Sequence, residues 1–154
     1  MANFEKSQMS VINRFSLLDT DSNIECAKGG LQSNVFCAAD DQKRIMLWKI
    51  HKKNPKLTLT GSPSDIRSVT FHIKDTYVFA STDGGGVYGW DLSTSKMSMK
   101  LTGHLTTCNF MEVSTESENA HLMITGSVDT NVRIWDLRTC KTVNTLKNHS
   151  NAVN

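Results

Sequence analysis

The stretch TGSVDTNVRIWD, residues 125–136, decides the fold of this chain, because weaker copies of it recur upstream at a nearly constant interval. The tryptophans mark that interval: Trp48, Trp90 and Trp135 follow one another in steps of 42 residues (48 to 90) and 45 residues (90 to 135). A fixed period of this size is typical of a chain built from stacked structural units that bury apolar surface against one another. The sequence therefore predicts a repeat protein with three such units.

A Gly-His pair provides a second marker with the same period. The pair is intact at Gly103-His104, whereas Gly61-Ser62 keeps only the glycine and Asn148-His149 keeps only the histidine. The steps between these pairs are 42 residues (61 to 103) and 45 residues (103 to 148), which match the tryptophan steps. Two independent markers in one register indicate the period of a four-stranded propeller blade.

With these motifs the chain resembles the WD-repeat family over about residues 11–154, which is nearly its whole length. The resemblance implies an all-β fold, a partial WD-repeat β-propeller of about three four-stranded antiparallel blades. We expect an irregular leader, three repeats and the start of a fourth, at residues 1–10, about 18–60, 61–102, 103–147 and 148–154 respectively.

The middle unit shows the expected order of strands most clearly. Its apolar runs, separated by turn residues, predict an inner strand at 66–71, a second at 77–80, a third at 87–90 and an outer one at 97–101. The second strands of the three units are apolar on consecutive residues instead of alternate ones. A strand needs that pattern when both faces of its sheet are covered, so the sequence favours stacked sheets over a single half-exposed sheet.

Three blades cannot close a ring, so we expect both terminal blades to leave an apolar face uncovered. Residues 11–17 are candidates for the outer strand of a last blade, whose inner strands are not found in this sequence. Such faces exceed the apolar area that soluble monomers usually expose. We therefore expect either a longer parent chain or self-association through the open blade faces.

Composition indicates a soluble globular protein. The chain of 154 residues is 21% charged and 38% apolar, and its net charge of +2 is too small to predict a nucleic-acid partner. No run approaches the length of a membrane span and the N-terminus has no signal-peptide pattern, so we expect a cytosolic protein without a membrane partner. The cysteines have no CxxC spacing, and we expect them to be reduced, with no metal or cofactor: Cys26, Cys37, Cys108 and Cys140.

The WD-repeat resemblance implies a buried hydrogen-bond chain in the third unit, formed by His104, Thr125, Asp129 and Trp135. The residue types suit such a chain. A carboxylate can fix one imidazole nitrogen, a hydroxyl can meet the other, and an indole N–H can complete the set. The alternative is a catalytic His-Asp-Thr arrangement. No nucleophile–base pair, metal spacing or phosphate loop supports an enzyme elsewhere in the sequence, so we expect a structural role and no catalysis.

The first two units lack this set, and we expect packing to hold them together. In the middle unit, the positions of the histidine, the hydroxyl and the carboxylate are occupied by Ser62, Ala80 and Gly84. In the first unit, Thr20 lies near the histidine position, Lys49 replaces the aspartate of Trp-Asp, and Asp40-Asp41 is one residue out of register.

Two features suggest surfaces for a partner. Seven basic or imidazole side chains and no acidic one lie between positions 43 and 56: Lys43, Arg44, Lys49, His51, Lys52, Lys53 and Lys56. This density suits an acidic partner such as a tubulin tail or a phosphate, with Lys49, Lys52 and Lys53 as candidate contacts; a solvated hairpin end is the alternative. Trp-Asp-Leu-Arg at 135–138 fits the WDxR pattern that some WD-repeat proteins present to the adaptor of cullin-RING ubiquitin ligases, although Arg138 also suits a local ion pair.

Within the WD-repeat family the chain is most similar to the regulatory, non-catalytic subunit of katanin, the microtubule-severing complex. The resemblance rests on LWKI at 47–50 with a Lys-Asn-Pro turn after it, GVYGWDL at 86–92 and GSVDTNVRIWDLR at 126–138. It implies a non-enzymatic scaffold that targets a severing complex to microtubules or spindle poles, with microtubules or the severing ATPase as partners.

The same resemblance implies a location in the cytoplasm, at the cytoskeleton, the centrosome or the spindle pole. The C-terminal region with which that family binds the severing ATPase is not found in this sequence, so we expect targeting without activation. The alternative function is that of another WD-repeat adaptor, such as a substrate receptor of a cullin-RING ubiquitin ligase.

Overall fold

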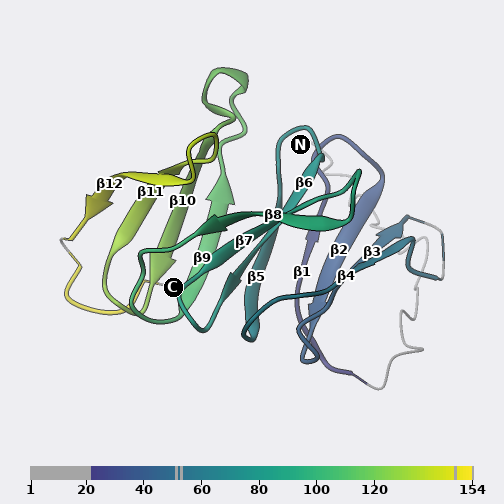
Figure 1. Ribbon diagram of the computed structural model, residues 1–154, viewed down its shortest axis with the longest axis horizontal. Coiled ribbons are helices and arrows are strands. Elements are labelled where there is room, and N and C mark those ends of the chain that lie inside the picture. The colour runs from purple at the N-terminus through teal and green to yellow at the C-terminus, as the bar shows by residue number, and fades with distance from the viewer. Residues whose placement is uncertain (1–21, 51, 53, 148, 154) are drawn as a thin grey trace, which may run out of the picture.

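The computed structural model of the chain describes residues 22–50, 52, 54–147 and 149–153 and shows a nearly all-β protein. Three four-stranded antiparallel sheets stand side by side, and in each sheet every strand pairs with the next one along the chain (Figure 1). The predicted fold class is therefore confirmed. The expected leader at 1–10, the candidate strand at 11–17 and Thr20 lie outside the described residues.

The strand bounds follow the repeat. The first sheet contains β1 (Ile24–Gly29), β2 (Val35–Asp40), β3 (Ile45–Lys49) and β4 (Leu57–Leu59). The second contains β5 (Ile66–Phe71), β6 (Tyr77–Thr82), β7 (Val87–Asp91) and β8 (Lys96–Leu101). The third contains β9 (Cys108–Val113), β10 (Leu122–Ser127), β11 (Val132–Asp136) and β12 (Lys141–Leu146), with the short 3-10 helix η1 (Ser117–Asn119) before β10. In the described part of the chain no helix has the length and apolar character that a membrane span requires.

The second strand of each sheet runs further than its apolar residues predict. β6 continues past Ala80 through Thr82, and β10 continues past Ile124 through Ser127. Two of the added polar residues are buried with their hydroxyl groups on backbone acceptors: Thr82 Oγ1 donates to the Gly86 carbonyl at 2.9 Å, and Ser127 Oγ donates to the Thr107 carbonyl at 2.8 Å.

The turns between second and third strands share one backbone conformation in all three sheets. Lys43, Gly85 and Thr130 occupy equivalent turn positions, with φ of 61°, 76° and 66°. Only glycine adopts this left-handed region without steric cost. At Gly85 space also matters, because a Cβ there would stand 2.8 Å from the His104 carbonyl oxygen of the next unit. The glycine run at 84–86 is thus a tight turn packed against the neighbouring sheet.

Apolar side chains from facing sheets form the core. Phe79, Val87 and Leu101 of the second sheet pack against Met123 and Trp135 of the third, and all five are buried. A corresponding layer joins the first and second sheets: Cys37, Ile45, Leu47, Leu59, Ile66, Phe71, Val78 and Trp90. Both faces of the second sheet are therefore covered, as its consecutive apolar residues predict.

Polar contacts also cross between sheets. The Asp75 carboxylate, in the β5–β6 loop, accepts the backbone N–H groups of Leu31, Gln32 and Ser33 at 2.9, 2.9 and 2.7 Å and the Ser33 hydroxyl at 2.6 Å. Desolvation raises the pKa of Asp75, but these hydrogen bonds outweigh it and hold the pKa below its ordinary value. The carboxylate stays charged and clamps the β1–β2 loop to the second sheet.

The outer face of the first sheet contradicts one expectation. Ala38, Met46 and Trp48 point away from the second sheet, yet they are buried, and Trp48 is only 1% exposed. The Phe36 ring lies parallel to the Trp48 indole with their centroids 5.3 Å apart and covers part of it. The expectation that both terminal sheets leave an open apolar face is therefore wrong for the first sheet.

The outer face of the third sheet is open. Ile124 and Leu146 are 38% and 43% exposed, whereas their equivalents Phe79 and Leu101 in the second sheet are fully buried by the third. Phe110 is also exposed on the third sheet, and a hollow of about 330 Å³ lies over Ile124. This surface has the composition of a contact between two sheets, but no further sheet covers it among the described residues.

The last described residues begin to cover this face. Val153 donates its N–H to the Ser127 carbonyl at 3.0 Å, and its side chain stands directly over Gly126. Val153 follows Cys108 by one repeat step of 45 residues (108 to 153), as Gly126 follows Ser81 (81 to 126), and Cys108 contacts Ser81. Val153 thus meets the third sheet at the point where Cys108 meets the second.

We predict that the isolated chain self-associates through the third-sheet face as its concentration rises, because apolar surface of this kind is stabilised by burial. Ile124→Lys should weaken the association and lower the fluorescence of a hydrophobic dye, whereas Leu105→Lys, a matched change at an exposed leucine elsewhere, should do neither. Light scattering with the dye checks this. A monomer of unmodified chain that does not bind the dye would contradict the prediction.

Candidate functional site

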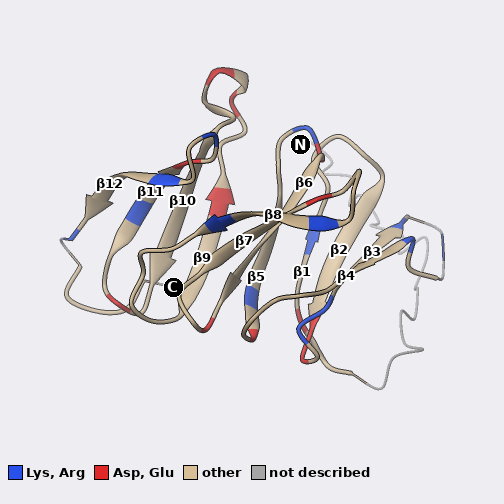
Figure 2. Ribbon diagram, in the orientation of Figure 1, with Lys and Arg blue, Asp and Glu red and all other residues tan. Residues whose placement is uncertain are grey.

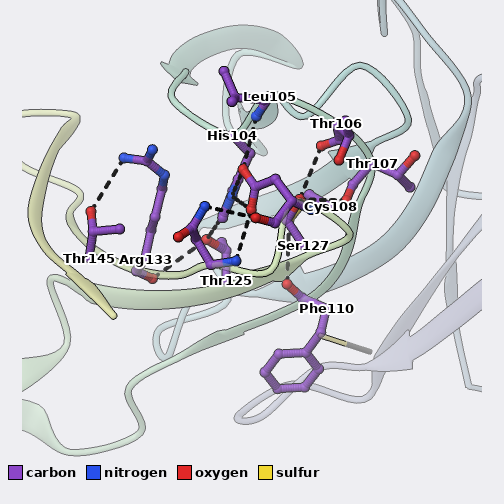
Figure 3. A network of polar contacts seen from close by, with 12 residues as sticks. His104, Leu105, Thr106, Thr107, Cys108, Phe110, Thr125, Ser127, Arg133 and Thr145 are labelled. Atoms are coloured by element: carbon purple, nitrogen blue, oxygen red, sulfur yellow. Dashed lines mark hydrogen bonds and ion pairs between the residues drawn. The ribbon is translucent and has the colours of Figure 1, made fainter. Parts of the chain in front are cut away.

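A chain of hydrogen-bonded side chains in the third sheet, here called the polar chain, is the most organised cluster in the described residues. Figure 3 shows the part of it around His104 and Thr125. His104 Nδ1 lies 3.0 Å from Asp129 Oδ2, and His104 Nε2 lies 2.8 Å from Thr125 Oγ1. Trp135 donates its indole N–H to the same Thr125 oxygen at 2.8 Å. The structure thus brings together all four residues that the family resemblance implied, from four different segments of the unit.

Local structure explains how each group reaches its place. His104 stands in the segment before β9, Thr125 in β10, Asp129 in the β10–β11 turn and Trp135 in β11. The Asp129 carboxylate accepts two further bonds, each at 3.0 Å, from the backbone N–H of Asn131 in its own turn and from that of Leu105 in the segment before β9. The carboxylate therefore ties the loop before β9 to the hairpin of the same sheet.

Burial and hydrogen-bond partners together define the protonation states of His104 and Asp129. Burial desolvates the imidazolium and lowers the pKa of His104, although the bond to Asp129 acts in the opposite direction. Desolvation would raise the pKa of Asp129, but the Leu105 amide and His104 outweigh it and lower the pKa to about 2. A neutral His104 then donates from Nδ1 to the Asp129 carboxylate and accepts the Thr125 hydroxyl proton at Nε2.

This arrangement does not suit catalysis. Thr125 is 0% exposed, and its oxygen already accepts the Trp135 N–H while its proton serves His104. A nucleophile must reach its substrate, so the His-Asp-Thr set supports the fold instead. Among the described residues no cluster of His, Cys, Asp or Glu side chains has the composition of a metal site.

The cysteines do not provide a reactive thiol in the core. Burial raises the pKa of Cys37 and of Cys108 to about 12, and that of Cys26 to about 11. The thiolate is the reactive form of cysteine, so these side chains act as small apolar groups at neutral pH.

The first two sheets satisfy the equivalent positions differently. Trp90 donates its indole N–H to the Thr60 carbonyl at 3.0 Å, since Ala80 has no hydroxyl to offer. In the first sheet Asp40 binds Ser22 Oγ at 3.1 Å and Arg44 at 2.7 Å, so it organises its own turn instead of fixing a histidine.

The structure divides the basic segment into two parts at opposite ends of β3 (Figure 2). Lys43 lies 3.5 Å from Asp65, and Arg44 pairs with Asp40. At the other end Lys49, Lys52 and Lys56 are exposed, form no ion pair within the described part of the chain, and surround a hollow of about 420 Å³. His51 and Lys53 lie outside the described residues.

Sequence reasoning missed the apolar floor beside these lysines. An adjoining hollow of about 360 Å³ shares Lys49 and Lys56 and is lined by Leu47, Trp48 and, from the second sheet, Leu92. Leu92 lies 36 residues beyond Lys56 in the chain (56 to 92), so no local pattern joins them. The β-sheet stacking brings them to one rim.

The sequence suggested either an adaptor contact or a local ion pair for Arg138, and the structure shows the ion pair. Its guanidinium binds both carboxylate oxygens of Asp136, at 3.0 Å through Nε and 2.6 Å through Nη2, and lowers the pKa of Asp136 to about 2. The side chain is still 67% exposed.

We predict that His104→Ala destabilises the chain by about 2–4 kcal/mol, because it removes one buried hydrogen-bond partner each from Thr125 and Asp129. Ser62→Ala, at the equivalent position of the second unit, removes only a bond to the Ser64 carbonyl and should cost about 1 kcal/mol or less. Chemical denaturation of both variants checks this. Equal losses of the free energy of unfolding in the two variants would show that the polar chain does not stabilise the third unit beyond an ordinary hydrogen bond.

We also predict a pH dependence that originates at His104. The unfolded chain binds a proton near the ordinary histidine pKa of 6.5, whereas the folded chain does so only at lower pH, so the free energy of unfolding falls as the pH drops below about 6.5. Asp129 contributes its full share to the free energy of unfolding above its ordinary pKa of 3.8, and this share is lost as the pH falls towards about 2.

His104→Gln should therefore flatten the decrease in melting temperature between about pH 7 and pH 5. His149→Gln, a matched change at an exposed histidine, should leave the decrease as it is. Melting curves of the three proteins across this range measure it, and parallel curves for His104→Gln and the unmodified chain would refute the assignment.

Comparisons with known proteins give the family. The family described as WD domain, G-beta repeat, matches residues 53–91 and 95–136, which together exceed half of the chain. The chain is 25% identical over 121 residues to protein tipD of Dictyostelium discoideum, covering 77% of this chain and 19% of that protein. It is 33% identical over 94 residues to coatomer subunit beta'-1 of Arabidopsis thaliana, covering 60% of this chain and 10% of that protein.

A third relative is the WD repeat-containing protein 26 homolog of Arabidopsis thaliana, 27% identical over 127 residues, covering 82% of this chain and 20% of that protein. The chain thus spans a fifth or less of the length of these relatives. Among solved structures, those of U3-55K and of the RRP9 WD40 repeats superpose with a TM-score of 0.80 at 17% identity; they cover 89% of this chain, which spans 43% and 42% of theirs. With the repeat, the three stacked sheets and the family match in agreement, the chain belongs to the WD-repeat family.

Proposed function

We propose that this chain is a docking module that places a microtubule-severing complex on microtubules or spindle poles, as the regulatory subunit of katanin does. WD-repeat proteins generally act as scaffolds that bind other proteins, and the proposal specifies the partner. It includes a location in the cytoplasm, at the cytoskeleton or centrosome. The proposal rests on the resemblance of residues 47–50, 86–92 and 126–138 to that subunit.

One observation carries the proposal beyond resemblance. Lys49, Lys52 and Lys56 gather at the β3–β4 hairpin and are not neutralised by any acidic residue that the structure describes. Exposed charges of one sign raise the local concentration of an oppositely charged partner and steer its approach. Acidic tubulin tails on the microtubule surface are such partners.

The relatives agree with a role in assemblies. One of them is named as a subunit of coatomer, so a chain similar to this one forms part of a larger complex. The proposed partners of this chain are the microtubule and, within a longer protein, the severing ATPase.

A second candidate function is that of a substrate receptor for a cullin-RING ubiquitin ligase. The observation that favours it is the exposure of Arg138 at the end of the WDxR pattern. The bidentate pair with Asp136 engages Nε and Nη2 of the guanidinium, which weakens this candidate relative to the first.

We predict that the chain pellets with microtubules and that Lys49→Glu combined with Lys52→Glu weakens the binding roughly tenfold or more at low salt, because attraction becomes repulsion. Lys141→Glu combined with Lys147→Glu provides the matched control, since both lysines are exposed on the third unit. Equal pelleting of the two double variants would exclude the hairpin as the docking surface.

The adaptor of the ubiquitin ligase is tested in parallel by capture on immobilised chain. Capture that Arg138→Ala abolishes and Arg67→Ala leaves intact would favour the second candidate, because Arg67 forms a comparable ion pair with Asp83 on another sheet. Failure of the chain to hold either partner would refute both functions.

A further inference from the structure

We propose that the rim between the first two sheets binds an acidic linear segment that carries one large apolar side chain. The site, here called the hairpin groove, consists of the two hollows that share Lys49 and Lys56. The inference rests on the proposed docking function and specifies what the hairpin recognises: an extended protein segment, not only a negative surface.

The hairpin groove lies where two sheets meet. One wall comes from the β3–β4 hairpin, with Lys49 and Lys56 at its ends, and the opposite wall comes from the turn after β7, with Leu92 and Ser95. Ligand sites commonly form at such junctions because neither element alone can enclose a side chain.

Its inner part is apolar. Leu47 forms its buried floor, on the face of the first sheet that packs against the second, and the walls include Val35, Leu57 and Leu92, which are partly buried and remain within reach of a ligand. A volume of about 360 Å³ is near the lower end of the roughly 300–1,000 Å³ typical of ligand pockets, so it holds one large side chain and little more.

Its outer part is basic. The hollow of about 420 Å³ is lined by Lys49, Lys52, Asn54 and Lys56, so an extended chain whose apolar residue enters the inner part passes three ammonium groups. Acidic residues on either side of the apolar one would meet these groups, and Asn54 can bind the peptide backbone.

The acidic residue in the lining forms no ion pair with these lysines among the described contacts. Asp75 contributes to the inner hollow, but its carboxylate oxygens receive the Leu31, Gln32 and Ser33 amides and the Ser33 hydroxyl. Because Asp75 is occupied by the β1–β2 loop, the three lysines remain available for a ligand.

A protein segment fits the hairpin groove better than a nucleic acid does. Single-stranded nucleic acids bind where aromatic faces are exposed for stacking. The aromatic residue in this lining is Trp48, which is only 1% exposed, with Phe36 lying flat on it. Phosphates could meet the lysines, but the apolar floor would then remain unused.

Fluorescence anisotropy with two labelled peptides tests the proposal. Both peptides are glutamate-rich and about ten residues long; one has leucine and the other glycine at its centre. The leucine peptide should bind roughly tenfold tighter, and this advantage should persist at about 150 mM salt, because burial of an apolar side chain is not screened. Equal binding of the two peptides would overturn the proposal.

Variants assign the two parts of the site. Lys49→Glu, Lys52→Glu and Lys56→Glu together should abolish binding of both peptides, whereas the matched set Lys74→Glu, Lys141→Glu and Lys147→Glu, at exposed lysines elsewhere, should not. Leu92→Ser should remove only the advantage of leucine. If that variant does not fold, the peptide pair on the unmodified chain still decides the matter. A labelled oligonucleotide that binds more tightly than the leucine peptide would also overturn the proposal.

The outcomes separate this inference from the microtubule proposal. Leucine-dependent binding without microtubule pelleting would support the hairpin groove and refute microtubules as the partner. Pelleting that depends on Lys49 and Lys52, together with equal binding of the two peptides, would support a purely electrostatic docking surface and refute the groove.

Discussion

Burial of sheet faces against neighbouring sheets is the interaction on which the rest of this structure depends. Phe79 and Leu101 of the second sheet are covered by Met123 and Trp135 of the third, and the first sheet covers the other face of the second in the same way. A sheet with both faces buried needs its backbone polar groups paired between strands, and the antiparallel order of each sheet provides that pairing. Where the neighbour is missing, at Ile124 and Leu146, the same design exposes apolar surface.

Polar chemistry is added to this packing and differs from sheet to sheet. The indole N–H at the repeated tryptophan position is satisfied by Thr125 in the third sheet and by the Thr60 carbonyl in the second, while that of Trp48 has no partner within the described residues. The hydrogen-bond chain of His104 is thus one solution among several. At the positions of this hydrogen-bond chain the second unit has Ser62, Ala80 and Gly84, and it still folds into four strands because its apolar layers remain intact.

Since the sheet faces are occupied by one another, partner binding is left to the rims. The β3–β4 hairpin and the turn after β7 belong to different repeats, yet stacking places them around one groove. Loops held by a rigid scaffold commonly carry function in this way. The hairpin lysines form no ion pair within the described residues, and Asp75, the acidic residue in the groove lining, is engaged by the β1–β2 loop.

The sequence by itself determined the number of repeats and the order of strands, and its resemblance to the WD-repeat family implied the four residues of the polar chain. The repeats and strands follow from spacing and side-chain type, which act over the length of one repeat: Trp48, Trp90 and Trp135 fall in β3, β7 and β11 as their period predicts. The ends of the second strands could not be predicted as well, because Thr82 and Ser127 are polar and the partner of the Ser127 hydroxyl, Thr107, belongs to another segment.

Only the tertiary structure decided which face is covered, which charges are free and where a ligand can enter. It buries Trp48 on a face expected to be open, separates Lys43 and Arg44 from Lys49, and brings Leu92 to the hairpin. The physical reason is common to all three. Burial and ion pairing depend on distances through space between different repeats, whereas the sequence pattern records only the requirements within one.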